Sequence, residues 1–127
     1  MPLIRLTQIN STTLSKHQIN KIMKAIVKLI GKKVLIRADR AGVFYGTLCE
    51  IEPLGDKYQV ELTDCRRIWY WSGAASLTQM AMEGVKDPSS CKFTMWQRSI
   101  VVNGVIEVHD CTDKAIKSIE GVTIWKN

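Results

Sequence analysis

Residues 66–77 read RRIWYWSGAASL: two arginines, an isoleucine, three consecutive aromatic residues and then a run of small residues. Side chains alternate between the two faces of a strand, so Trp69 and Trp71 are expected on one face and Ile68 and Tyr70 on the other. Both faces are then apolar, which predicts a strand that is covered on both sides. A helix that starts beside guanidinium groups and aromatic rings suits a nucleotide. A buried strand that leads into an ordinary capped helix explains the same pattern.

Length and composition indicate one globular domain over residues 1–127, with residues 1–13 as a loose arm or an edge strand. The chain is 46% hydrophobic and 24% charged. No apolar run approaches the roughly 18 to 20 residues of a membrane span, and the N-terminus lacks a secretory signal, so a cytoplasmic location is expected. The four cysteines form no C-x-x-C pair, so small buried side chains are expected rather than a zinc site.

Periodicity predicts an α+β fold. A capping box at Ser15 and Gln18 begins an amphipathic helix that Gly31 ends. Short, closely spaced strands favour a curved antiparallel sheet or a small barrel. Residues 39–42 indicate a tight turn, residues 52–56 a loop, and residues 64–65 the end of a strand. Gly46 inside a strand indicates a bulge or a close backbone approach. The Asn103-Gly104 pair predicts a hairpin turn in which Asn103 adopts a positive φ. The expected helices are 15–30, 74–83 (capped by Ser72) and 113–120 (capped by Thr112), and the expected strands are 33–38, 43–51, 58–63, 101–106 (the hairpin) and 122–125.

Charge is distributed unevenly along the chain. Residues 1–40 hold nine Lys or Arg and one acidic residue, whereas residues 41–127 hold nine basic and eleven acidic residues, for a total of +6. A local positive field is typical of a protein with an anionic partner. Nucleic acid and a phosphorylated small molecule both fit this description, and so does a merely solvated basic surface.

Catalytic motifs are lacking in the sequence. The two histidines lie in no nucleophile motif, and G-x-S-x-G, H-E-x-x-H and G-x-x-x-x-G-K are all missing. Glu50 and Glu52 fall on one face of a strand, where solvated carboxylates are the simpler interpretation. The sequence therefore favours binding over catalysis, and we expect no catalytic residue, metal ion or cofactor.

Several blocks together resemble a family of small phage and prophage proteins. The blocks are residues 37–46 (RADRAGVFYG), 66–77, 91–93 (CKF) and 111–121. This resemblance covers about residues 33–125. Among such proteins the nearest functional resemblance is to the first type of Thoeris anti-defence sponge. The resemblance implies a phage protein of the host cytoplasm. Such a protein holds glycocyclic ADP-ribose, the signal of TIR-domain immunity, without cleaving it.

The same resemblance implies ligand residues and an assembly. Arg37, Arg66, Phe93 and Asn103 match the arginines, the aromatic residue and the asparagine of the sponge site, and Trp71 offers a further aromatic face. By this resemblance Arg37 and Arg66 would hold the pyrophosphate, and Phe93 would stack on the adenine. Such sponges form dimers or trimers of dimers, and some hold cyclic trinucleotides at a separate site. Nanomolar retention requires about 12 kcal/mol, which favours a pocket closed between subunits. A basic nucleic-acid-binding module, a signal-degrading nuclease and a phage structural protein are the alternatives.

Overall fold

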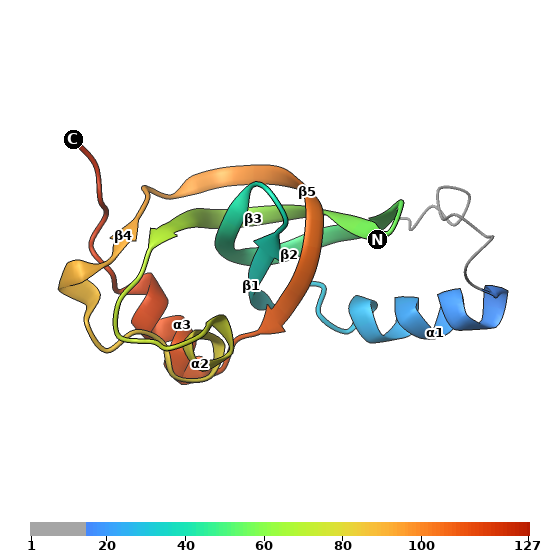
Figure 1. The fold of residues 1–127 in the computed structure, drawn as a ribbon, viewed down its shortest axis with the longest axis horizontal. Helices are drawn as coiled ribbons and strands as arrows, with labels where there is room; N and C mark the ends of the chain where they lie inside the picture. The colour runs from blue at the N-terminus through green and yellow to red at the C-terminus, as the bar shows by residue number, and fades with distance from the viewer. Residues whose placement is uncertain (1–14) are drawn as a thin grey trace.

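The computed structural model describes residues 15–127. In this part of the chain, helices and strands follow one another in the α+β arrangement that the periodicity predicts (Figure 1). They are α1 (Lys16–Val27), β1 (Lys33–Ala38), β2 (Gly42–Leu54), β3 (Lys57–Tyr70), α2 (Leu77–Glu83), the 3-10 turn η2 (Pro88–Ser90), β4 (Lys92–Phe93), β5 (Gln97–Asp110) and α3 (Asp113–Glu120). The predicted arm over residues 1–13 lies outside the described residues. Between residues 15 and 127, no helix combines the length and the apolar character needed to cross a bilayer.

The sheet is antiparallel and strongly curved, as expected. Its strand order is β2-β1-β5-β3-β4, and β2 also pairs with β3, so the sheet curls back on itself. Figure 1 shows the long strands β2, β3 and β5 bending around a common interior. The bends allow one strand to serve two neighbours, because β5 pairs with β3 over its first half and with β1 over its second half.

β2 and β3 contain a bulge at the point where the sequence predicts the end of a strand. The predicted interruption at Asp64-Cys65 is wrong, because β3 continues through it to Tyr70. Asp64 has a φ of 46°, and the pair takes the space opposite the single residue Gly46. A Cβ on Gly46 would lie 2.6 Å from the Cβ of Cys65, so this position needs glycine, and the predicted bulge or close approach at Gly46 is confirmed.

The β2–β3 connection is shorter than predicted. Residues 52–56 were expected to form a loop, but the two strands pair up to Leu54 and Lys57, which leaves a two-residue turn. Proline has no backbone N–H to donate to a neighbouring strand. Pro53 is accommodated because β2 pairs with β1 only up to Thr47, so that no strand lies beside this edge of β2 at Pro53.

The predicted hairpin at residues 101–106 is also wrong. β5 runs without interruption from Gln97 to Asp110, and only Gly104 of the Asn-Gly pair has a positive φ, of 75°. Val105 is the residue at which β5 leaves Tyr58 of β3 and reaches Ala38 of β1. The Asn-Gly pair therefore marks a bend inside one strand, a role that local sequence does not distinguish from a turn.

Two apolar cores lie on the two sides of the curved sheet. One fills the interior of the curl and includes Phe44, Leu48 and Val60. The other lies between the sheet and the helices α2 and α3, with Leu35 and Phe93 at its centre. In Figure 1, α2 and α3 lie together at one end of the molecule, and α1 extends from the other end.

The helix caps agree largely with the sequence. Ser15 forms the predicted capping box of α1, and Thr112 caps α3 as expected. α1 ends at Val27, however, and α2 begins only at Leu77 with Ser76 as its cap, so the prediction of Ser72 was wrong. The expected closing strand at residues 122–125 is reduced to one parallel bridge, between Ile124 and Phe93.

The aromatic run at the end of β3 is not covered on both sides. Ile68 is buried and Trp71 is half-buried against the helix-side core, but Trp69 and Tyr70 are exposed. The expectation of a doubly covered strand fails there because β3 extends beyond the curl, where only the two-residue strand β4 pairs with it.

Candidate functional site

Arg66, predicted to hold a phosphate, is instead a buried hub of the helix-side core. Its side chain is only 1% exposed. The guanidinium packs between two aromatic rings, with its carbon 5.4 Å from the centroid of Phe93 and 4.8 Å from that of Trp96. Burial lowers the pKa of this guanidinium. It donates hydrogen bonds of 3.0–3.2 Å to four backbone carbonyls, those of Phe93, Thr94, Ile119 and Val122.

Phe93, predicted to stack on an adenine, belongs to the same core. It is 0% exposed, so neither face of its ring is open to a ligand. The structure therefore brings Arg66 and Phe93 together, as the resemblance implies, but as a structural pair that joins β3 and β4 to the end of α3. Trp71 packs against the same core and is half-buried.

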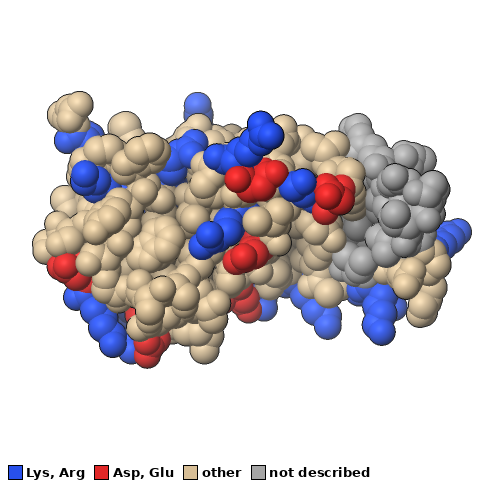
Figure 2. All heavy atoms as spheres, in the orientation of Figure 1, with Lys and Arg blue, Asp and Glu red and all other residues tan. Residues whose placement is uncertain are grey.

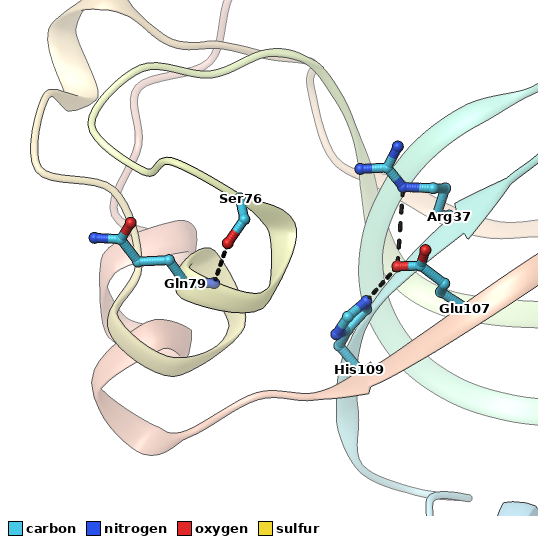
Figure 3. A network of polar contacts seen from close by, with 5 residues as sticks. All are labelled: Arg37, Ser76, Gln79, Glu107 and His109. Carbon is cyan, nitrogen blue, oxygen red and sulfur yellow. Dashed lines mark hydrogen bonds and ion pairs between the residues drawn. The ribbon is translucent and has the colours of Figure 1, made fainter.

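Arg37 belongs to a separate polar network on the surface of β1 and β5 (Figure 3). Its Nε lies 3.9 Å from a carboxylate oxygen of Glu107, and the same carboxylate lies 2.7 Å from Nε2 of His109. Within residues 15–127 this buried Nε has no hydrogen-bond partner. The figure also shows the cap that Ser76 forms on the N–H of Gln79 in the neighbouring helix α2. Arg37 thus pairs with an acid and shares no site with Arg66.

Asn103 lies in an open groove of about 360 Å³, which is within the usual range for small-ligand sites. One wall is the turn between β1 and β2, and the other is the middle of β5. The groove is lined by Asp39, Arg40, Ala41, Phe44, Arg67 and the β5 residues Ile100, Val101, Val102, Asn103 and Gly104. Of the five predicted ligand residues, it contains Asn103 alone.

Arg67 follows Arg66 in β3, so its side chain lies on the opposite face of the sheet and lines this groove. Its guanidinium carbon lies 4.3 Å from the centroid of the Phe44 ring, and its Nη1 donates to the carbonyl of Ala41. The backbone N–H of Arg67 donates to Oγ1 of Thr94 at 2.9 Å, which fixes the strand beneath it. Among the described residues, the hydrogen bonds of this side chain involve Nη1 only, so Nε and Nη2 remain available to an acceptor in the groove.

Asp39 and Gly104 fix the two walls against each other. The N–H of Asp39 donates to the carbonyl of Gly104 at 2.9 Å, and the carboxylate of Asp39 lies 3.6 Å from Nζ of Lys57. A Cβ on Gly104 would lie 2.4 Å from Oδ1 of Asp39. The close approach and the positive φ both require glycine at this position.

The groove offers complementary polar groups. Arg40 and Arg67 are donors for a phosphate, because guanidinium N–H groups form strong charge-assisted bonds to phosphate oxygens. Asn103 accepts from Nε2 of Gln59 at 2.8 Å through its oxygen, which leaves its NH₂ group to donate. The carboxylate of Asp39 can accept from a hydroxyl. The described lining therefore suits a phosphorylated ligand that also carries hydroxyl groups.

Sequence reasoning missed Arg67, Arg40 and Asp39. The signal for Arg67 was the alternation itself, which places Arg66 and Arg67 on opposite faces without saying which face is covered. Arg40 and Asp39 were identified only as turn residues, since their position over β5 depends on the long-range pairing of Ala38 with Val105.

Neither the curated proteins nor the solved structures contain a match to this chain. A family model does match it, over residues 31–119, a stretch that contains the groove, Arg66, all five strands and nearly all of α3. The chain therefore belongs to the family described as a domain of unknown function, DUF6948.

Proposed function

We propose that this protein binds and holds a cyclic nucleotide of the ADP-ribose type, glycocyclic ADP-ribose, without cleaving it. The observation that carries the proposal is the groove between the β1–β2 turn and β5, where two arginines and an amide face a partly apolar wall. The resemblance to Thoeris anti-defence sponges supports the class of ligand. On this proposal the protein is phage-encoded and acts in the host cytoplasm.

Each part of such a ligand has a counterpart in the groove. The pyrophosphate would accept from Arg67 and Arg40, and the ribose hydroxyls would donate to Asp39 and accept from Asn103. The adenine would contact the apolar side chains of β5, of which Val101 is 58% exposed. The site differs from the one that the resemblance implies, since Arg67 takes the role expected of Arg66.

The binding free energy of tight retention requires a further surface that covers the groove. Nanomolar retention corresponds to about 12 kcal/mol, and each charge-assisted hydrogen bond contributes about 1.5–3 kcal/mol. Two arginines and an amide in an open groove supply only part of this free energy. A second copy of the chain that covers the groove would exclude water and bury Val101, so a dimer, or a trimer of dimers, forms part of the proposal. A separate site for cyclic trinucleotides stays a prediction of the resemblance.

Calorimetry with purified glycocyclic ADP-ribose tests the proposal. We expect tight binding, and after heat denaturation the nucleotide should be recovered chemically unaltered. The Arg67→Ala variant should weaken binding at least about tenfold, the equivalent of one lost charge-assisted bond. The matched control is Arg98→Ala, which removes an exposed β5 arginine outside the groove lining. Recovery of a cleaved nucleotide would reject sequestration, and equal affinities for the two variants would reject the groove.

A further inference from the structure

Two exposed tryptophans lie side by side at the end of the molecule that carries β4 and the C-terminus. Trp69 of β3 is 63% exposed and Trp125 is 42% exposed. Their rings are nearly parallel, with an interplanar angle of 8° and centroids 6.5 Å apart. Exposed indoles contribute little to the stability of the chain itself, so this arrangement indicates a surface that meets another molecule.

The backbone holds both rings in place. Trp69 belongs to β3, whose neighbouring residues Ile68 and Tyr70 pair with β4. The N–H of Trp125 donates to the carbonyl of Phe93 at 2.9 Å, next to the bridge between Ile124 and Phe93. The ring pair is therefore preorganised on the edge of the sheet, and a ligand would not have to order a loose tail.

Cations accompany the rings. Nζ of Lys92 lies 5.6 Å from the centroid of the Trp125 ring, and Lys126 follows Trp125 in the chain. Within residues 15–127 neither lysine forms an ion pair with an acidic side chain. Figure 2 shows basic side chains beside the C-terminus on the visible face, and the acidic side chains at this end of the molecule lie further from it. The surface thus combines flat aromatic faces with uncompensated positive charge.

We propose that Trp69, Trp125 and Lys92 form a stacking platform for single-stranded nucleic acid. Every nucleobase has a π-face that stacks on an indole, and the phosphate that follows each base carries the charge that Lys92 and Lys126 complement. We favour single-stranded nucleic acid over a protein partner because the two ring faces are parallel and the adjacent lysines are both positively charged. This surface is separate from the groove, which neither tryptophan lines.

Fluorescence anisotropy with labelled oligo-dT and oligo-U of about 20 nucleotides at low salt tests the proposal. We expect wild type to bind both, and Trp69→Ala and Trp125→Ala each to weaken binding at least about tenfold, the effect of one lost stacking ring. Trp125→Phe, which keeps an aromatic face, should retain most of the affinity. Lys92→Gln should reduce the slope of log affinity against log salt by about one.

Two controls make the result specific. Met82→Ala and Ile106→Ala each remove an exposed apolar side chain, from α2 and from β5; neither should change oligonucleotide binding. Thermal unfolding checks that every variant is folded. Failure of wild type to bind either oligonucleotide would overturn the proposal, and so would equal affinities of wild type and Trp125→Ala. A wild-type dimer that Trp125→Ala converts to a monomer in sedimentation velocity would instead identify the platform as a self-association surface.

Discussion

Arg66 and Arg67 are neighbours in the chain but serve opposite sides of the sheet. Arg66 lies inside the helix-side core, where four carbonyls and two rings surround its guanidinium. Arg67 lies over Phe44 at the open groove, where the described residues accept from a single nitrogen of its side chain. The same residue type is a structural crosslink at one position and a candidate ligand contact at the next.

The difference shows what determines the role of a charged residue in this fold. A cation inside a core is tolerated only when hydrogen bonds replace the water that it loses. The ends of β4 and α3, with the residues that follow them, supply those acceptors to Arg66; the carbonyls of Phe93 and Ile119 also accept from the N–H groups of Trp125 and Val122. Among the described residues, no such set of acceptors surrounds the side chain of Arg67. Stability and ligand binding should therefore separate cleanly between the two arginines.

The largest effect is expected for the stability of the Arg66→Ala variant. Removal of this side chain takes a donor from four carbonyls, of which those of Phe93 and Ile119 keep a backbone donor, and opens a cavity beside Phe93. The free energy of unfolding should therefore fall by about 4 kcal/mol. Arg67→Ala, which loses one hydrogen bond and an exposed cation–π contact, should lose only about 1 kcal/mol. Urea denaturation of both variants measures the difference. Similar losses for the two would contradict the division of roles.

A smaller change in the free energy of unfolding is expected for the substitution of two glycines, Gly104 in the groove wall and Gly55 outside it. Gly104 and Gly55 both have positive φ, of 75° and 66°, but an added Cβ meets Asp39 at Gly104 and nothing within 4 Å at Gly55. Gly55→Ala should lower the free energy of unfolding by about 1 kcal/mol through backbone strain alone. Gly104→Ala should lower it by about 2 kcal/mol, since Asp39 must also move, and should weaken nucleotide binding. Equal affinities of these two variants for the nucleotide would show that Asp39 does not shape the site.

A pH-dependent effect concerns the ionisation of a thiol in the helix-side core. Burial, with a smaller contribution from Asp110, raises the pKa of Cys111 from its ordinary value near 9 to about 12. The folded state therefore favours the neutral thiol, and its contribution to stability is complete below about pH 9 and is lost as the pH rises towards 12. The melting temperature should fall over that window, and Cys111→Ala should make the fall shallower. An unchanged slope in the variant would assign the effect to other groups.

Thiol labelling extends the same comparison. Cys49 on β2 is only partly buried, whereas Cys111 lies in the helix-side core. In the native protein at pH 8, an alkylating reagent should modify Cys49 well before Cys111. The reagent reacts with a thiolate that it can reach, and the buried thiol of Cys111 is neither accessible nor readily ionised. Mass spectrometry of the digested protein gives the order. Early modification of Cys111 would indicate that the helices α2 and α3 open readily.

Much of the fold was predictable because its signals are local. Ser15 and Thr112 cap helices through side chains that reach N–H groups three residues away, and Gly46 permits a close approach that any larger residue would block. The candidate site was less predictable. The resemblance to the sponge family implied Arg66 and Phe93, and the structure places both in the core; the groove instead depends on the pairing of β1 with a distant part of β5.

The sequence by itself determined the α+β class, the caps of α1 and α3 and the curvature of the sheet, since each follows from spacing and from glycine over a few residues. Only the tertiary structure decided that Arg66 is covered and Arg67 open, and that Asn103-Gly104 bends one strand instead of joining two. Those outcomes depend on which distant segment lies against each face. When a strand has apolar residues on both faces, its local sequence does not indicate which face another segment will cover.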